Sequence, residues 1–385
     1  MKKNFRFLVV AAMCMCGLAG LAFISGHPAA AQSGLEMAGL KPVPAYDMPK
    51  EEFEAKTREF KDTPAGDQYV AYSLRIPIEW QQAKASEQEQ DGQGLSGGAG
   101  NLFGEVARFY GPSLLDSRTY FIVQTAELAH DITARNWFLN YILESGFTLQ
   151  YMTEISDQKI EALYVQIKGD TSYVVRAIAA INGTRIVMLL YAVPEQKWME
   201  ERPMQDNVLR SFAFQNKAET IVEDRRTYAF LDLLRFDYPA SWRLLAPNIF
   251  SVEEMEASIL NSPDGKAISG EIDVHVVSTE LDTTLAQEVK KLQQKVEERG
   301  LLIGKLLDTP KKYDVHEHIY FSRVEVYEAN DKNQALVDHE YWIGVLMEDR
   351  YFYIVTMLTP ARTVDFYGWA TNTEAFETVI ESLRP

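Results

Sequence analysis

The chain has only two cysteines among its 385 residues, and both, Cys14 and Cys16, lie in one apolar stretch near the N-terminus. We expect this stretch to be removed, which leaves no disulfide, thiolate nucleophile or cysteine-ligated metal. Basic residues are also few, since 38 Lys and Arg stand against 55 Asp and Glu, a formal net charge of −17. This acidity argues against nucleic-acid binding and against binding to anionic membrane surfaces.

Residues 1–31 have the three parts of a secretory signal peptide. Basic residues at the start precede an apolar run at residues 7–24, and three alanines at 29–31 follow as a cleavage site. The apolar run alone is long enough to be a membrane span, but the small residues after it favour cleavage. We therefore predict export to the periplasm, a mature chain that begins at Gln32, and no membrane insertion after cleavage.

One motif occurs twice, as LRIPIEW at residues 74–80 and as FDYPASW at residues 236–242. In each copy a strand-like run ends at a proline, and a tryptophan follows three residues later. The order of predicted strands and helices after each copy is the same, which indicates an internal duplication. The matching positions are Pro77 with Pro239, Trp80 with Trp242, Gly146 with Gly300, Pro194 with Pro360 and Ser211 with Ser382.

The duplication predicts a domain division with five parts. These are a signal peptide at 1–31, an N-terminal arm with a short helix at 32–67, a first domain at 68–214, a linker at 215–226 and a second domain at 227–385. We call residues 68–214 the first repeat and residues 227–385 the second repeat. The arm either packs on the first repeat or binds a partner, and the sequence leaves both open.

Local signals place several elements. Thr133 is a typical N-cap and Gly146 a typical C-terminal end for a helix with an apolar stripe, and Asn182-Gly183 predicts a hairpin turn. Residues 87–101 are rich in Gln and Gly, which predicts a mobile loop. This loop contains the pattern G-x-G-x-x-G at residues 92–97, but no strand precedes it and no helix follows it. We therefore predict no nucleotide cofactor.

The order of elements, with P-x-x-W after the first strand, a helix ended by glycine, a three-stranded meander and a closing helix, resembles the Mog1/PsbP-like (DcrB-like) superfamily. The closing patterns at residues 208–212 (VLRSF) and 379–383 (VIESL) carry the same resemblance. The resemblance implies an α+β fold of two tandem α/β/α sandwich domains, each an antiparallel sheet flanked by helices. It also implies a mostly non-enzymatic family of accessory, assembly or binding subunits.

No catalytic, cofactor or metal residue can be assigned from the sequence. His316 and His318 lie two apart at a predicted strand start, but a guessed register puts His339 opposite Arg323 and so too far away to complete a metal site. His275 is expected on the polar side of its strand, and Ser96 has no evident base beside it. We predict that the protein is not an enzyme.

The residues chosen for possible protein binding are aromatic. Phe53 and Phe60 are seven apart on the short helix predicted in the arm. Phe366, Tyr367 and Trp369 fall in a predicted loop before the last helix, where they either pack over the sheet end or form a recognition patch.

We therefore expect a periplasmic, non-catalytic accessory or scaffold protein of an envelope assembly, such as a secretion or transport apparatus, acting through protein partners of unknown identity. The alternative is a periplasmic protein that binds a small ligand or a metal in a pocket between the domains.

Overall fold

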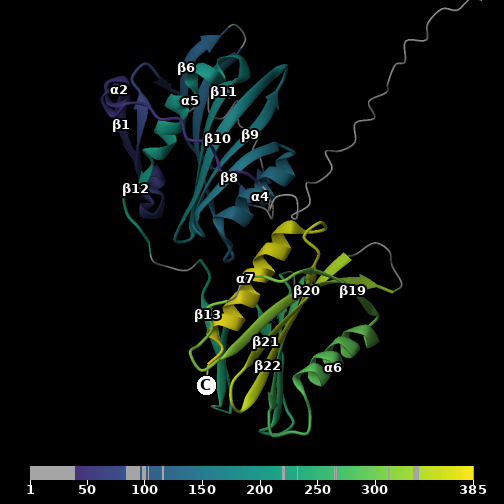
Figure 1. Ribbon diagram of the computed structural model, residues 1–385. Helices are drawn as coiled ribbons and strands as arrows, with labels where there is room; N and C mark the ends of the chain where they lie inside the picture. The colour runs from purple at the N-terminus through teal and green to yellow at the C-terminus, as the bar shows by residue number, and fades with distance from the viewer. Residues whose placement is uncertain are drawn as a thin grey trace, which may run out of the picture. The chain divides into compact units, whose positions relative to one another are not determined.

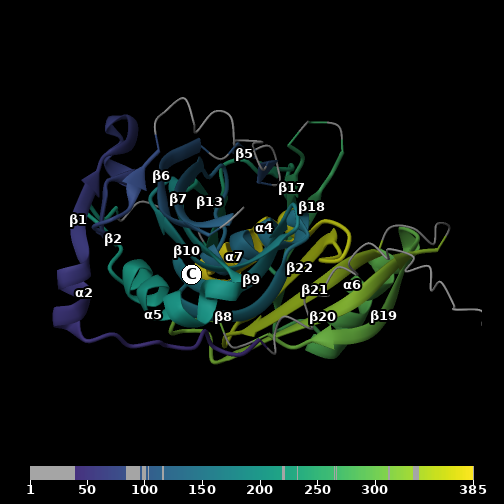
Figure 2. The same cartoon turned by 90° about the horizontal axis from the view of Figure 1, so that it is seen from above.

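The computed structural model describes residues 40–384 except 84–95, 98–100, 103, 115–116, 219–221, 232, 264, 266, 311–312 and 333–337. The predicted signal peptide and most of the predicted Gly-rich loop lie outside the described residues. Figure 1 shows the ribbon, and Figure 2 shows it from above.

The first repeat is built on a seven-stranded antiparallel sheet in the order β3-β6-β7-β11-β10-β9-β8. Its strands are β3 Gln81–Gln82, β6 Gly104–Leu114, β7 Ser117–Glu127, β8 Thr148–Ser156, β9 Lys159–Lys168, β10 Thr171–Asn182 and β11 Arg185–Pro194. Strands β10 and β11 form a hairpin in which Asn182 pairs with Arg185, and Gly183 takes a φ of 59° in the turn between them. The hairpin predicted here is confirmed, because this backbone conformation suits glycine.

A second, smaller sheet covers part of one face of this sheet. It consists of β1 Thr57–Asp62, β2 Tyr72–Pro77 and β12 Ala213–Phe214. The helices are α2 Lys50–Lys56, α4 Ala134–Ser145 and α5 Glu195–Arg210, with single 3-10 turns η1 Pro64–Gly66 and η2 Gln68–Val70. Figure 2 shows β2 and α5 on the same side of β10. Two short strands, β4 Ser96–Gly97 and β5 Asn101–Leu102, form a separate two-stranded sheet.

The second repeat has an eight-stranded antiparallel sheet in the order β15-β17-β18-β22-β21-β20-β19, with β16 beside β17. Its strands are β15 Arg243–Leu244, β16 Asn248–Ile249, β17 Glu254–Asn261, β18 Gly270–Ser278, β19 Leu301–Asp308, β20 Phe321–Asp331, β21 Asp338–Met347 and β22 Tyr351–Pro360. Its first two strands, β13 Arg225–Phe230 and β14 Leu234–Pro239, form a separate two-stranded sheet. The helices are α6 Leu285–Glu298 and α7 Phe366–Ser382.

The expected pair of helix-flanked α/β/α sandwiches is wrong. The structure is mostly strand, with strands at 49% and helices at 23%, and it contains several antiparallel sheets. The physical reason lies in the strands that end at Pro77 and Pro239. Each pairs with a neighbouring strand in a small sheet of its own, so that strands take much of the space on the large sheet that helices were expected to fill. The division into two domains stays a prediction.

Helix α4 begins and ends where the local sequence signals predicted. The Thr133 hydroxyl accepts a hydrogen bond from the backbone N–H of Asn136, and Gly146 ends the helix with a φ of 66°. Both ends are therefore set by groups within one turn. The apolar stripe of Trp137, Phe138 and Tyr141 is buried against the large sheet, as predicted.

The described part of the N-terminal arm lies on the first repeat. Residues 40–49 have no regular structure, and α2 follows them. The carbonyl of Pro44 accepts a hydrogen bond from Arg176 Nη1 at 3.0 Å, and the N–H of Tyr46 donates to the carboxylate of Asp206. Asn207 Nδ2 donates to the carbonyl of Tyr46 at 3.1 Å. The arm is thus attached to a charged group in the interior.

That group consists of Arg176 on β10, Asp206 on α5 and Glu161 on β9. The side chains of Arg176 and Asp206 are completely buried, with Arg176 Nη2 at 2.7 Å from Asp206 Oδ1. Arg176 Nε also lies 2.6 Å from Glu161 Oε1. A buried charge without its partner is costly, so this network should be sensitive to the loss of any one member.

We expect Arg176→Met to destabilise the protein by about 3 to 5 kcal/mol, because it leaves Asp206 buried without its main partner. Arg210, whose Nε lies 2.8 Å from Asp206 Oδ1 and whose side chain is 43% exposed, is the matched control. Arg210→Met should cost less than about 1 kcal/mol. Urea unfolding followed by tryptophan fluorescence measures both, and equal costs for the two variants would contradict the assignment.

Candidate functional site

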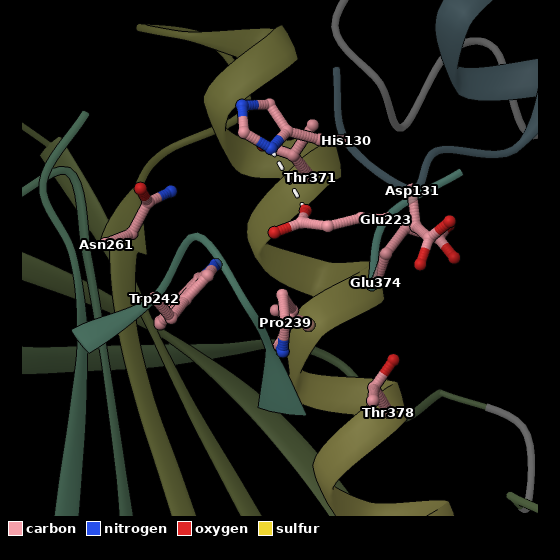
Figure 3. Close-up of a pocket in the computed structure, with 10 residues that line it drawn as sticks. His130, Asp131, Glu223, Pro239, Trp242, Asn261, Thr371, Glu374 and Thr378 are labelled. Carbon is pink, nitrogen blue, oxygen red and sulfur yellow. Dashed lines mark hydrogen bonds and ion pairs between the residues drawn. The ribbon is translucent and has the colours of Figure 1, made fainter. Parts of the chain in front are cut away.

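A narrow cleft beside α7 brings together three acidic groups with shifted pKa values, Asp131, Glu223 and Glu374. We call it the α7 cleft (Figure 3). Its lining residues come from both repeats and the linker and are His130, Asp131, Glu223, Pro239, Trp242, Asn261, Thr371, Glu374, Ala375 and Thr378. Its free interior, about 10 Å³, is close to the smallest space that holds one water molecule. Ligand pockets for small molecules are typically at least thirtyfold larger.

Glu223 is the best-satisfied acid in the α7 cleft. Its Oε2 lies 3.1 Å from His130 Nδ1, and its Oε1 accepts a hydrogen bond from the N–H of Ser241 at 2.7 Å. Burial raises the pKa of this carboxyl, but the bonds from His130 and Ser241 outweigh burial and hold the pKa below its usual value. Glu223 is therefore an ionised group that joins a loop of the first repeat to the start of the second.

The pKa values of Glu374 and Glu377 on α7 are shifted in the opposite direction. Burial, reinforced by Glu377, Asp131 and Asp157, raises the pKa of Glu374 to about 8. The backbone N–H of Thr133 opposes this shift without cancelling it. Burial together with Glu381 and Asp157 raises the pKa of Glu377 to about 7. The neighbouring acids disfavour the charged forms of Glu374 and Glu377, and uptake of a proton removes this repulsion.

The chemistry available in the α7 cleft is limited. A carboxyl with a pKa near neutrality is a feature of many catalytic acids and bases. Here, however, the hydroxyls of Thr371 and Thr378 line the cleft, and the Thr371 hydroxyl already bonds to carbonyls of its own helix. Within the described part of the chain, no group of three or more His, Asp or Glu side chains is arranged to hold a metal. The carboxyl of Glu374 can therefore take up or release a proton near neutral pH.

A second cleft lies between α6 and the sheet of the second repeat. His275 is buried there, with Nδ1 at 3.4 Å from Glu256 Oε2, and Lys295 Nζ approaches the same oxygen at 3.1 Å. The bond to His275, helped by Lys295, lowers the pKa of Glu256 to about 2 despite its burial. Burial raises the pKa of the neighbouring Asp273, which Ser258 opposes by a hydrogen bond. The polar face expected for His275 is confirmed, and the opposite face buries Ile272, Val274 and Val276.

The predicted aromatic site residues are mostly in the core. Phe53 is buried on α2, but Phe60 lies on β1 and not on the same helix, and its ring centroid is 5.0 Å from that of Phe109. Phe366, Tyr367 and Trp369 are not in a loop, because α7 starts at Phe366, where Asp365 caps it by accepting from the N–H of Gly368 at 2.9 Å.

Trp369 has a structural role. Its Nε1 donates to Glu340 Oε2 at 2.8 Å, and Trp342 Nε1 donates to the same oxygen at 3.1 Å. Arg362 Nε lies 2.7 Å from the other oxygen of this buried carboxylate. With Trp369 9% exposed and bonded inward, it is not available as a recognition residue.

The histidines considered for a metal site are not brought together with His339. His316 and His318 lie in an irregular segment before β20, with ring centroids 5.0 Å apart. His339 pairs with Ala329 on β20 and with Pro360 on β22, so the register placing it opposite Arg323 is wrong. The guess failed because the loop between β20 and β21 begins later than assumed.

The sequence interpretation missed a group of exposed apolar side chains along β17. Leu245 is 37% exposed, Ile249 42%, Phe250 66% and Val252 56%. Backbone bonds attach them to β17, since the N–H of Leu245 donates to Ser258 and that of Phe250 to Glu254. We call these four residues the β17 edge cluster. The available signal was the run IFSV at residues 249–252, which is apolar within a stretch expected to be a divergent loop.

No protein-family model matches this chain, and no curated protein matches it. Among solved structures, part of the chain is similar to a PsbP-like domain, the cyanobacterial PsbP (CyanoP) from Synechocystis sp. PCC 6803. The identity is 16%, over 42% of this chain and 93% of that chain, with a TM-score of 0.29. The immunity protein TplEi of T6SS from Pseudomonas aeruginosa is 9% identical over 81% of this chain and 94% of that chain, with a TM-score of 0.22. At these TM-scores neither similarity carries an argument about function.

The α7 cleft predicts a stability that depends on pH. Glu374 keeps its proton in the folded chain up to about pH 8 but loses it near pH 4.5 when unfolded. The stability that this proton contributes is complete below pH 4.5 and is lost as the pH rises to 8. Glu374→Gln should therefore stabilise the protein at pH 8.5, by about 1 kcal/mol after screening by solvent, and change little at pH 4.

Thermal unfolding at pH 4 and pH 8.5 measures this effect. Glu298→Gln, an exposed glutamate on α6, is the control and should behave like the unmodified protein at both values. If Glu374→Gln and the unmodified protein lose the same stability between the two pH values, Glu374 does not take up the proton.

Proposed function

We propose that this chain is an exported, periplasmic and non-catalytic accessory or scaffold protein of an envelope assembly, which acts by binding other proteins. The observation that supports the proposal is the β17 edge cluster, since a group of large apolar side chains left in water is typical of a protein contact. The α7 cleft is too small for the ligand pocket of the alternative, a small-ligand-binding protein. In addition, none of the described helices is both long enough and apolar enough to cross a membrane.

The β17 edge cluster has the composition of a contact with an acidic border. Phe250 and Val252 provide an aromatic and an aliphatic anchor, and the exposed Glu253 and partly exposed Glu254 follow directly. Aromatic anchors commonly dominate binding energy, while border charges set the orientation and rate of approach. The partner that fits is a protein with an apolar hollow bordered by basic side chains.

The order of elements in the two repeats supports the proposed tandem PsbP/Mog1-like (DcrB-like) assignment. The likeness suggests an accessory role, but similar folds serve many functions, so the surface residues carry the functional proposal.

Removal of the whole arm is not a clean test of this function. Residues 57–62 form β1, which pairs with β2 along its full length, and Phe60 packs on the core of the first repeat. A deletion of residues 32–66 would therefore damage the first repeat as well as the arm. Point substitutions of exposed residues avoid this problem, because they usually change stability by less than about 0.5 kcal/mol.

We expect Phe250→Ser to reduce the recovery of envelope proteins with the tagged chain by at least about tenfold, as for loss of an aromatic anchor worth about 2 kcal/mol. The measurement is affinity purification from chemically cross-linked envelopes. Ile167→Ser removes an apolar side chain that is 74% exposed in the first repeat and serves as the matched control. Recovery of the tagged chain alone, with no partner for the unmodified protein or either variant, would refute the proposed function.

A further inference from the structure

Strands β8 and β19 occupy corresponding positions at one end of the two large sheets. Strand β8 follows α4 and Gly146, strand β19 follows α6 and Gly300, and each is the last strand in its sheet. Figure 1 shows β19 at the end of its sheet, beside β20. When residues are counted from the two glycines, Tyr151 corresponds to Lys305, and the next two residues of each strand correspond in turn. What covers the edge of β8 can therefore be compared, position by position, with what covers the edge of β19.

The N-terminal arm covers the edge of β8. Lys41 forms a parallel bridge with Tyr151, and the N–H of Met152 donates to the carbonyl of Lys41 at 3.1 Å. The N–H of Val43 donates to the hydroxyl of Thr153 at 2.8 Å. Pro42 and Pro44 stand on the two sides of Val43 and have no N–H to offer to a further strand. A short extended segment with alternating prolines thus closes the sheet of the first repeat.

The edge of β19 is apolar and has no such cover among the residues that the structure describes. There, β20 is the one strand that pairs with β19. Leu302 is 49% exposed and Leu306 is 48% exposed. An edge strand that presents free backbone groups and large aliphatic side chains is a template for an additional strand. The register of β19 on β20 is interrupted after Ile303 and after Leu306, which disfavours long edge-to-edge pairing and suits a short segment.

The charge at this edge distinguishes between possible occupants. Lys305 takes the position of Tyr151, and its side chain is 72% exposed. Its ion pair with Glu328, at 3.0 Å, lies at the surface and contributes little. In a pairing like that on β8, the residue that corresponds to Lys41 would lie beside Lys305. A carboxylate is favoured there, whereas the arm of a second copy would bring Lys41 against Lys305.

From these observations, and resting on the proposed function, we infer that β19 binds an extended segment of another protein by strand addition. The segment runs parallel to β19 and has an acidic residue beside Lys305. The residue two positions further along it has a proline on each side, as Val43 has in the arm. Main-chain hydrogen bonds supply affinity in this mode of recognition, and the alternating side chains supply specificity. The β17 edge cluster lies at the opposite end of the same sheet, so the two surfaces can be tested separately.

Two fluorescent peptides test this inference. One has the sequence of residues 40–46 of this chain, and the other has the same sequence with Lys41→Glu. Fluorescence anisotropy with the full mature chain should show the acidic peptide bound about threefold to fivefold more tightly, the factor expected for exchange of a repulsive for an attractive cross-strand pair. In the Lys305→Glu variant this order should reverse. Binding at the β8 edge would not depend on residue 305.

Lys290→Glu, an equal charge change at an exposed position of α6, is the matched control and should leave the order unchanged. Absence of binding for both peptides, or an affinity order that does not follow the charge at residue 305, would overturn the inference. Capture of envelope proteins by the unmodified chain separates this result from the proposed function. Partners captured while both peptides fail would overturn the strand-addition site alone, and a charge-dependent peptide order without any captured partner would overturn the proposed function alone.

Discussion

Strands β10 and β11 bury their side chains on both faces, and this double burial governs the rest of the first repeat. Residues 186–193 of β11 are almost completely inaccessible to water. A sheet of this kind is stable only when something covers each face. Helix α4 covers one face, and α5 with the small sheet of β1, β2 and β12 covers the other. The residues that can contact other molecules are therefore confined to the ends of the strands and to the sheet edges.

The interior charges follow from the same requirement. Arg176 points from β10 into the layer beneath α5, where it needs Asp206 and Glu161 as partners. In the second repeat, Glu340 forms an ion pair with Arg362 and accepts hydrogen bonds from two indole N–H groups. Both networks pair opposite charges and hold helices on sheets. The α7 cleft differs, because Glu374 and Glu377 meet other acids and burial raises their pKa values. Because of that difference, we expect the ionisation of the α7 cleft to change near neutral pH.

The two repeats share some structural features and differ in others. The strand order and the helix ended by glycine occur in both, whereas the cover on the outermost strand is described for the first repeat alone. The second repeat leaves apolar side chains exposed at both edges of its sheet, on β19 and beside β17. Edges are where a sheet can accept another chain without repacking its interior. A binding role for the second repeat is consistent with this asymmetry.

The sequence by itself determined the elements whose signals lie within a few residues of one another. The cap at Thr133, the end of α4 at Gly146 and the hairpin turn at Gly183 depend on local backbone geometry, so they could be predicted. The other features depended on tertiary structure, because several strands far apart in the sequence can compete to pair with the same strand. Tertiary structure placed the strands ending at Pro77 and Pro239 in small sheets, buried Trp369 against Glu340, and gathered Asp131, Glu223 and Glu374 from distant segments into one cleft. The hydrophobic periodicity of the sequence does not predict these tertiary contacts, because each contact depends on how the sheets and helices pack once they have formed.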